Sequence, residues 1–503
     1  MLRINYNFQS EFGHVNILKT ERSLNTSLER LETGYRINSA KDDAAGLFIA
    51  DQLNLVANAL DQGVRNSQDG ISAAQIAETS LSQIYDKLVS IYTKAEQAAN
   101  DVNSALSRSA LQQDINQLID AIDRIAKSAE FNGKKLLDGS FKNQYIHYGP
   151  RADQKLTMSI DSATATDLAA YTVRGSGQTV AGTTGLATLL TNNRDFRFDA
   201  GSDTVQVQGI NIESSLIDGS ITDAKAIADA INQNAELQKK GIEASATNLS
   251  IADTAFSTIS VGTGGLDINF YVGPETTADF TLSYASGSSV SLTQIIDDIN
   301  SKARDLGLNL VAKEEGGKLV LETEGETVAL EVVAGVGTTV DLSTLVQGAT
   351  GSVNDGTGSA VKVGDLTLVG SDSYAYDFTG VSTTSTGLGL SAVDTATKSS
   401  LKTSAKVDTN ANAEFTLRLV NAVIKKVDKM RADLGSIQIS LETIIQNNEF
   451  SAVQQREAES RIRNVDFAKE MANFTRYQTL MQSGMAMLAQ ANQLPQLVLQ
   501  LLR

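Results

Sequence analysis

The sequence contains no cysteine and no tryptophan, only three prolines and only two histidines among its 503 residues. Without cysteine there is no disulfide, no thiolate metal ligand and no cysteine nucleophile. His14 and His147 are far apart and have no neighbouring cluster of ligands, so a zinc site or a Ser/His/Asp triad is poorly supplied. We therefore predict a protein that is not an enzyme, with no catalytic residue, no metal and no cofactor.

Long hydrophobic runs are also missing. Residues 1–25 lack the continuous apolar core of a secretory signal, because Glu11, Lys19 and Glu21 interrupt it. Residues 477–502 carry no charge, but glutamine and asparagine recur along them. Such amide side chains are costly in lipid, so the segment is predicted to pack against protein and not to insert into a membrane.

Basic charge is scarce in the middle of the chain, and most of the net charge of −17 comes from there. Residues 172–400 hold 28 acidic and 12 basic residues, so the two ends together are close to neutral. Near-neutral ends can pack densely against copies of themselves, whereas an acidic middle is solvated and repels its neighbours. This balance argues against nucleic acid as a partner, since binding it needs basic surface.

Both ends of the chain have apolar residues at the three- and four-residue steps of a helix. Those near the N-terminus include Phe8, Phe12, Leu24, Leu28 and Leu31. Those near the C-terminus include Met471, Phe474, Met481, Met485, Leu488, Leu494 and Leu501. Two one-sided helices at the ends of a chain have no core unless they meet. We predict that they pair and bury their remaining apolar faces against other copies, so that these residues drive self-assembly.

Three further segments have helical apolar spacing. The stripe in residues 41–100 consists of Ile49, Leu53, Val56, Leu60, Val64, Ile71, Ala74, Leu81, Ile84, Leu88, Ile91 and Ala95. Shorter stripes run from Leu111 to Ile125 and from Leu417 to Ile444. A repeat sustained over this length predicts a coiled-coil bundle. Two β-prone runs, Tyr145–Tyr148 and Leu156–Ile160, predict a small hairpin beside it.

Residues 173–404 are rich in Gly, Thr, Ser, Val and Asp and contain short β-prone runs. Two similar helical segments, 226–241 and 294–307, both contain Ile-x-x-x-Ile-Asn and end near a glycine. We interpret them as a degenerate repeat of a strand–helix–strand unit, which predicts two outer β-rich subdomains, 173–273 and 274–404, with a boundary near Pro274. A disordered insert and a chance similarity remain the alternatives.

Four stretches resemble bacterial flagellin: TGYRINSAKDDAAGLFIADQL at 33–53, FNGKKLLDG at 131–139, SRIRNVDFAKEMANFTR at 460–476 and LAQANQLPQLVLQLLR at 488–503. The resemblance covers roughly residues 1–172 and 405–503. It implies an α+β multidomain fold with terminal helices of an inner core (1–40 and 456–503). A helical shaft with its hairpin (41–172 and 405–455) would carry the outer β-rich region.

The same resemblance implies a function. It predicts a secreted structural subunit of the extracellular flagellar filament, which serves motility and has itself as main partner in a helical homopolymer. It further implies a flagellar export chaperone, a filament cap and hook-junction proteins as partners. Lys41, Asp42 and Asp43 in the linker 36–46 could make ion pairs between subunits or form a solvated turn.

One departure from the family pattern lies in the shaft. Many flagellins carry Leu-Gln-Arg-Val-Arg-Glu-Leu-Ala-Val-Gln there, the patch sensed by the host Toll-like receptor for flagellin. The same register here is Leu88 to Gln97, with Ser90, Tyr92 and Thr93 in place of the two arginines and the glutamate, followed by Lys94. The hypothesis is weak or absent receptor activation, and neutral drift is the alternative.

Other classes of protein share some of these features. A hook–filament junction protein would have similar end motifs but would not form a long filament. A coiled-coil surface adhesin would form an oligomer of fixed stoichiometry. An enzyme in the middle region would need a convergent polar pocket, which the sequence does not indicate.

Overall fold

The computed structural model describes residues 7–100 and 102–501, with the backbone alone for 494–501. The chain forms two units: unit 1 takes in residues 1–78, 141–160 and 432–503, and unit 2 takes in 79–140 and 161–431. The helices of the described chain are α1 (Phe8–Thr33), α2 (Ala44–Ala98), α3 (Ala105–Ser128), α4 (Leu186–Asn192), α5 (Ala224–Gln233), α6 (Ala235–Lys239), α7 (Leu292–Leu306), α8 (Leu401–Ser404), α9 (Asn410–Arg463) and α10 (Phe467–Leu501). This mixture of long helices near both ends and strands between them confirms the predicted α+β class.

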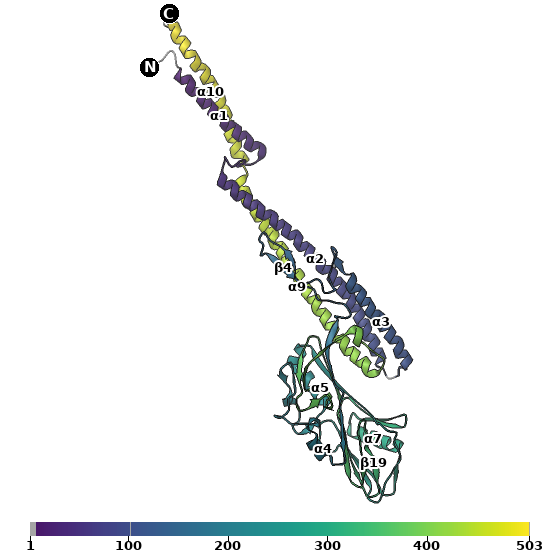
Figure 1. The fold of residues 1–503 in the computed structure, drawn as a ribbon. Helices are drawn as coiled ribbons and strands as arrows, with labels where there is room; N and C mark the ends of the chain where they lie inside the picture. The colour runs from purple at the N-terminus through teal and green to yellow at the C-terminus, as the bar shows by residue number, and fades with distance from the viewer. Residues whose placement is uncertain (1–6, 101, 502–503) are drawn as a thin grey trace. The chain divides into compact units, whose positions relative to one another are not determined.

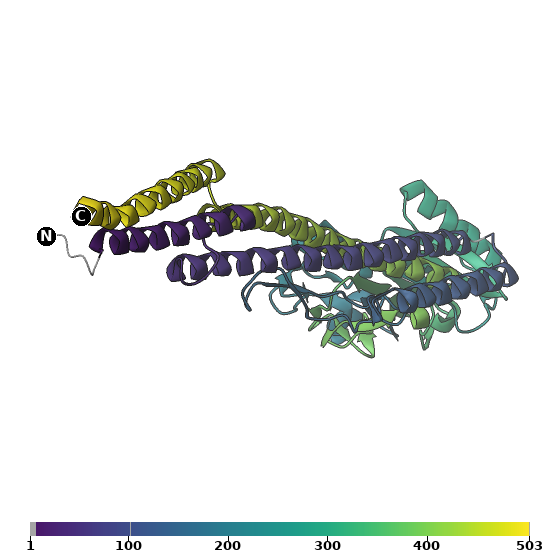
Figure 2. The same cartoon turned by 90° about the horizontal axis from the view of Figure 1, so that it is seen from above.

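In unit 1, α1 and α10 lie side by side and antiparallel (Figures 1 and 2). The side chain of Asn7 accepts a hydrogen bond from the Ser10 N–H at 3.1 Å and so satisfies one of the free donors at the start of α1. Gly34 ends the helix with φ +76°, a left-handed conformation that glycine adopts without steric cost. The local sequence therefore sets both ends of α1.

The linkers that follow α1 and α9 also meet within unit 1. Tyr35 and Asn464 form an isolated antiparallel β-bridge. The Arg36 guanidinium donates to the Ile462 carbonyl at 2.7 Å, which satisfies an acceptor in the last turn of α9. The chain thus joins its two distant halves directly below the α1–α10 pair.

The first part of α2 differs from the predicted apolar stripe. Its buried side consists mostly of small residues, and Ile49, which the stripe included, is 50% exposed. The buried positions are Gly46, Ala50, Ala57, Leu60, Gly63, Ser67, Gly70, Ala73, Ala74 and Ala77. A Cβ atom at Gly63 would lie 2.0 Å from the Tyr148 carbonyl oxygen, and one at Gly70 would lie 2.5 Å from Ile146 Cδ1.

These close approaches explain the difference. The residues near Gly63 and Gly70 belong to the hairpin of β3 (Gln144–His147) and β4 (Lys155–Met158), which pair antiparallel. The Asn66 side chain donates to the His147 carbonyl at 2.7 Å and fastens the hairpin to α2. Small residues on α2 make room for this backbone, and of the larger apolar residues in this part of the helix only Leu60 is buried.

In unit 2, the later part of α2 follows the predicted spacing. Leu81, Ile84, Leu88 and Ile91 are fully buried. In α3, the buried positions include Leu111, Ile115 and Ile122, as predicted, together with Ile119 and Ala126.

The strands of the middle region form three larger sheets and several two-stranded ones, and all pairings of the named strands are antiparallel. The six-stranded sheet has the order β16 (Val311–Glu315), β17 (Lys318–Thr323), β11 (Ile242–Ile251), β22 (Asp365–Gly370), β5 (Ala169–Arg174), β27 (Thr397–Ser400). The five-stranded sheet has the order β14 (Phe280–Tyr284), β13 (Leu266–Val272), β18 (Val328–Ala334), β21 (Thr357–Lys362), β6 (Thr179–Gly182). The four-stranded sheet has the order β26 (Val393–Thr395), β23 (Ala375–Asp377), β8 (Gln206–Val207), β9 (Ile210–Asn211). The remaining pairs are β1 (Glu130–Phe131) with β2 (Lys134–Lys135), β7 (Arg197–Phe198) with β10 (Ser220–Ile221), β12 (Ile259–Ser260) with β15 (Ser289–Val290), β19 (Thr339–Asp341) with β20 (Ser352–Asn354), and β24 (Ser382–Thr383) with β25 (Thr386–Gly387).

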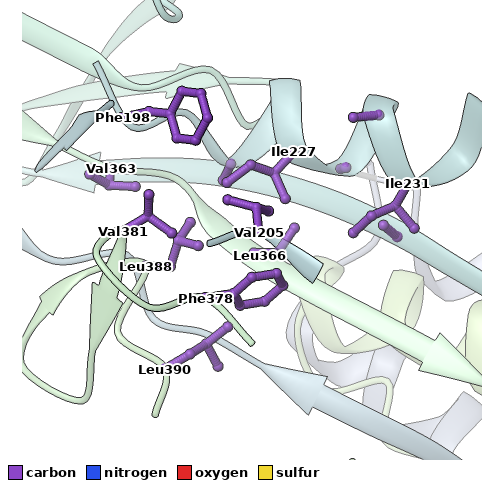
Figure 3. Close-up of a cluster of buried hydrophobic side chains, with 14 of the residues drawn as sticks. Phe198, Val205, Ile227, Ile231, Val363, Leu366, Phe378, Val381, Leu388 and Leu390 are labelled. Carbon is purple, nitrogen blue, oxygen red and sulfur yellow. The ribbon is translucent and has the colours of Figure 1, made fainter. Parts of the chain in front are cut away.

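Two hydrophobic cores lie on opposite faces of the five-stranded sheet. Tyr271, Ala329 and Val361 stand opposite one another on β13, β18 and β21 and belong to the first core. Their sequence neighbours Phe270 and Leu330 belong to the second core. This follows from the alternation of side chains along a strand. In the first core, side chains from α5 meet others from β22 and from the segment after β23 (Figure 3).

This shared sheet corrects the expected boundary near Pro274. The second core is built from residues between 252 and 360, whereas the first draws mainly on residues before and after them, with Tyr271 and Ala329 from within that span. The chain therefore enters the second core well before Pro274, at Ala252, and its main return to the first core is at Val361. Composition shows where β-rich sequence begins, but strand pairing across long distances decides which strands share a core.

The two segments of the predicted repeat make the same hydrogen bonds in α5 and α7. Asn232 donates to the Ala244 carbonyl at 2.8 Å and accepts from its N–H at 2.9 Å. Asn300 makes the same two bonds with Ala312, both at 2.8 Å. Gly241, which comes after α5 and the short α6, and Gly307, which comes directly after α7, both have φ +69°, and the next strands are β11 and β16. The motif Ile-x-x-x-Ile-Asn thus locks a helix onto the next strand.

Candidate self-assembly surface

The residues predicted to drive assembly divide into two groups on the α1–α10 pair. Partly buried are Leu24, Leu31, Phe474, Met481 and Leu488. Exposed are Phe8, Phe12, Leu28, Met471 and Met485, at 67%, 60%, 42%, 51% and 51%. Leu494 and Leu501 lie outside the residues whose side chains are described. The first group lies where one helix can cover the other, and the second faces outward.

The exposed apolar side chains of the pair extend beyond the predicted set. The rings of Phe8 and Phe12 stack with centroids 6.2 Å apart and leave most of their area open to solvent. Leu480 and Met487 on α10 are 50% and 69% exposed. Scattered apolar residues are normal on a surface, but a concentration of large ones along two helices marks an interaction site.

The sequence reasoning missed a further exposed group in unit 1. Phe48 and Leu55 on α2 are 66% and 62% exposed, and Ile439, Phe450 and Val453 on α9 are 67%, 66% and 57% exposed. These residues fall between the positions of the inward-facing stripe. Each is a large apolar residue on a long helix that falls outside the regular apolar stripe. The prediction from helical spacing considered only the residues within the stripe.

The linker carboxylates act within the chain. Asp42 accepts hydrogen bonds from the N–H groups of Ser39 and Asn38 at 3.0 and 3.2 Å, and also from the Ser39 hydroxyl. The Ser39 backbone contributes most to lowering the pKa of Asp42. Asp43 accepts from the Gly46 N–H at 2.8 Å at the start of α2. Both side chains therefore stabilise a turn, which was one of the two readings of the sequence.

The shaft patch lies on α2 in unit 2. The Ser90 hydroxyl donates to the Asp86 carbonyl at 2.8 Å, and the Thr93 hydroxyl donates to the Ser90 carbonyl at 3.0 Å, so both face back onto their own helix. Tyr92 is 37% exposed. Lys94 forms an ion pair with Asp114 on α3 at 2.6 Å. The patch therefore presents one aromatic ring and a neutralised lysine.

One carboxylate is deeply buried in the middle region. Asp223 is 4% exposed and accepts from the N–H groups of Thr327 and Ala226, at 2.6 and 3.0 Å. Burial raises the pKa of Asp223 to about 6, and the charge of the nearby Glu326 acts in the same direction. The group caps α5 and ties it to the strand β18 that follows Thr327, which is a structural role.

Across the part of the chain that the structure describes, no three or more histidine or acidic side chains stand close enough to hold a metal ion together. None of the described helices combines the length and apolarity needed to span a membrane.

Unit 1 has the arrangement of a structural protein. Its long helices come from the N- and C-terminal parts of the same chain, pack against each other and expose apolar side chains outward. Residues 4–142 match the model of the bacterial flagellin N-terminal helical region, and residues 417–502 match that of the C-terminal helical region. The chain is 47% identical to a flagellin of Aquifex pyrophilus over 507 residues, covering 100% of this chain and 99% of the relative. It is 43% identical to a flagellin of Aquifex aeolicus and 34% identical to the B-type flagellin of Pseudomonas aeruginosa, with 100% of this chain covered in each case and 99% and 100% of the relatives.

The chain belongs to the bacterial flagellin family. Flagellins match it from end to end, so the hook–filament junction protein is not favoured.

Proposed function

We propose that this chain is a structural subunit that polymerises into the bacterial flagellar filament and thereby serves swimming motility. The observation that carries the proposal is the α1–α10 pair with its outward apolar side chains, among them Phe8, Phe12, Met485 and Met487. A single chain leaves this surface in water, and a second copy covers it. Each square ångström of apolar surface so buried contributes about 25 cal/mol.

The charge distribution supports the same proposal. The near-neutral helical ends pack inside the filament, and the acidic middle region faces solvent, where like charges keep neighbouring filaments apart. By resemblance to the family, the chain is secreted to the extracellular filament. An export chaperone, a filament cap and hook-junction proteins are its further partners. The helices of the shaft form a coiled-coil bundle with the hairpin β3–β4 beside it.

The test uses the purified full-length chain. Short filament seeds or a precipitating salt are added, and the product is imaged by negative-stain electron microscopy. Long uniform filaments are expected from the intact chain and none from a variant that lacks residues 471–503. Oligomers of fixed size that are unchanged by the truncation would contradict the proposal and favour the adhesin.

The shaft patch supports a second, narrower proposal. Ser90, Tyr92 and Thr93 replace the charged side chains of the receptor-sensed motif, and Lys94 is engaged by Asp114. The chain therefore activates the host receptor for flagellin weakly or not at all. A cell reporter assay with purified monomer measures this, and a full-strength response would rule it out. A variant with Ser90→Arg, Tyr92→Arg and Thr93→Glu is the matched gain-of-function control.

A further inference from the structure

Glycines on α1 and α10 stand opposite large side chains of the other helix. A Cβ atom at Gly13 would lie 3.4 Å from Leu488 Cδ1, and one at Gly484 would lie 3.1 Å from Ile17 Cγ1. The large residue is on α10 in the first case and on α1 in the second. These contacts place residue 13 against 488 and residue 17 against 484, the same antiparallel register. Side chains of one helix thus fit gaps in the other at two successive levels.

A buried polar contact lies further along the same seam. The Ser27 hydroxyl donates to the Glu470 carboxylate, and the two residues are only 2% and 7% exposed. A carboxylate withdrawn from water is costly unless it keeps its hydrogen-bond donors. Polar residues at buried seam positions are known to specify register in paired helices at some expense of stability. This contact therefore opposes any pairing that separates the two residues.

We infer that the glycine contacts and the Ser27–Glu470 hydrogen bond determine the register of the α1–α10 pair. Each device excludes a different slip. A slip of one heptad that sets residue 17 against 477 brings Ile17 against Tyr477. Two large side chains then meet where Ile17 had faced a glycine. The opposite slip sets Gly484 against Leu24 and is sterically acceptable, but it moves Glu470 to Gly34, which has no side chain to donate.

The register matters for the exposed surface, and this consequence rests on the proposed function. Because residue 13 stands against 488, Phe12 on α1 lies at about the level of Met487 on α10. A slip of seven residues displaces them by ~10 Å, at 1.5 Å per residue. A second copy that fits the outer surface of one register does not fit the other. The register-determining residues thus specify assembly without contacting the neighbouring subunit.

Disulfide trapping tests the register directly, because the chain has no cysteine of its own. Ser10 Oγ lies 2.6 Å from Asn492 Oδ1, so Ser10→Cys with Asn492→Cys reports the observed register. Ser10→Cys with Met485→Cys, or with Leu499→Cys, reports a slip of one heptad in either direction. The full-length variants are oxidised in solution and on seeds, and non-reducing gels separate links within a chain from links between chains.

We expect the 10–492 pair to close at least about tenfold faster than either slipped pair, a preference of about 1.4 kcal/mol. Added Glu470→Leu should raise closure of the 10–499 pair, whereas Glu470→Gln, which keeps an acceptor, should not. Gly484→Ile should abolish closure of the 10–492 pair, and a second change, Ile17→Gly, should restore it by exchanging the large and small residues.

Equal closure of the three pairs, or a double variant no better than Gly484→Ile alone, would overturn the inference. Cross-linking reads register and electron microscopy reads filaments. A chain that closes the 10–492 pair selectively but forms no filament would contradict the proposed function and leave the register inference standing.

Discussion

The side-chain amide of Asn448 donates to the Tyr148 carbonyl over 2.6 Å, although the two residues are 300 positions apart. The contact lies directly above Gly63, where a Cβ atom would be 2.0 Å from the same carbonyl oxygen. Three separate segments of unit 1 therefore meet at a point where one of them must lack a side chain.

Gly63→Ala should destabilise unit 1 by about 1–3 kcal/mol, because the added methyl group forces the hairpin away from α2 and strains its hydrogen bonds. Gly435→Ala on α9 is the matched control. No atom lies within 4 Å of a Cβ placed at Gly435, so alanine should stabilise the helix there by about 1 kcal/mol. Thermal unfolding followed by circular dichroism measures both. Two shifts of the same sign would show that packing at Gly63 is not the cause.

Asp223 should make the stability of the middle region depend on pH. Its pKa is about 6 in the folded chain and 3.8 in the unfolded chain, so folding favours the protonated form. Stability contributed by this group is fully present below pH 3.8 and is lost as the pH rises through 6, about 3 kcal/mol in all. Asp223→Asn removes this dependence.

The measurement for Asp223 compares the two chains by urea denaturation at pH 7.5 and pH 5, followed by tyrosine fluorescence. Relative to Asp223→Asn, the natural chain should gain about 1.4 kcal/mol on acidification. A constant difference between the two chains at both pH values would mean that the carboxylate keeps an ordinary pKa despite its burial.

Phe12→Gln should weaken assembly and leave the folded monomer intact, since the ring is 60% exposed. If a second copy buries this ring, its loss costs about 1.5–3 kcal/mol and raises the critical concentration for seeded growth by about tenfold or more. Val336→Gln is the control, because Val336 is 64% exposed but belongs to the acidic middle region. Sedimentation of filaments after seeding gives the critical concentration. Equal effects of the two changes would remove Phe12 from the assembly surface.

Asn300→Ala should release α7 from β16, because both hydrogen bonds to Ala312 are lost and the backbone groups stay partly buried. The free energy of unfolding should fall by about 1–3 kcal/mol, and Asn232→Ala on the matching helix α5 should lower it by a similar amount. Asn300→Asp, which keeps the acceptor and loses the donor, should cost less than Asn300→Ala. Hydrogen exchange of the strand peptides shows where protection is lost, and unchanged exchange in β16 would contradict this role.

The parts of the fold that the sequence predicted are those in which spacing alone determines burial. Leu81, Ile84 and Leu88 repeat at helical steps and are buried, and the motif around Asn232 and Asn300 recurs with the same local contacts. The first part of α2 could not be predicted in this way, because contact with the hairpin determines which of its residues are buried. Nothing in the spacing of Ile49 and Leu53 shows that a backbone lies over Gly63 and Gly70.

The middle region was less predictable for a related reason. Phe270 and Tyr271 are neighbours in the sequence and enter different cores, and only the pairing of β13 with β18 reveals this. On α1 and α10, helical spacing selected apolar residues of two kinds. It did not separate those that face the partner helix, such as Leu24, from those that face outward, such as Phe12.

The pairing of α1 with α10 also determines when, during synthesis, the paired surface can form. The partner of α1 begins at Phe467, so a growing chain carries α1 unpaired until the residues between the two helices have been added. Contacts between such distant segments form late, because a long loop must close before they are gained. An unfinished chain therefore lacks the paired surface, and the order of synthesis itself keeps partial products from joining a growing polymer.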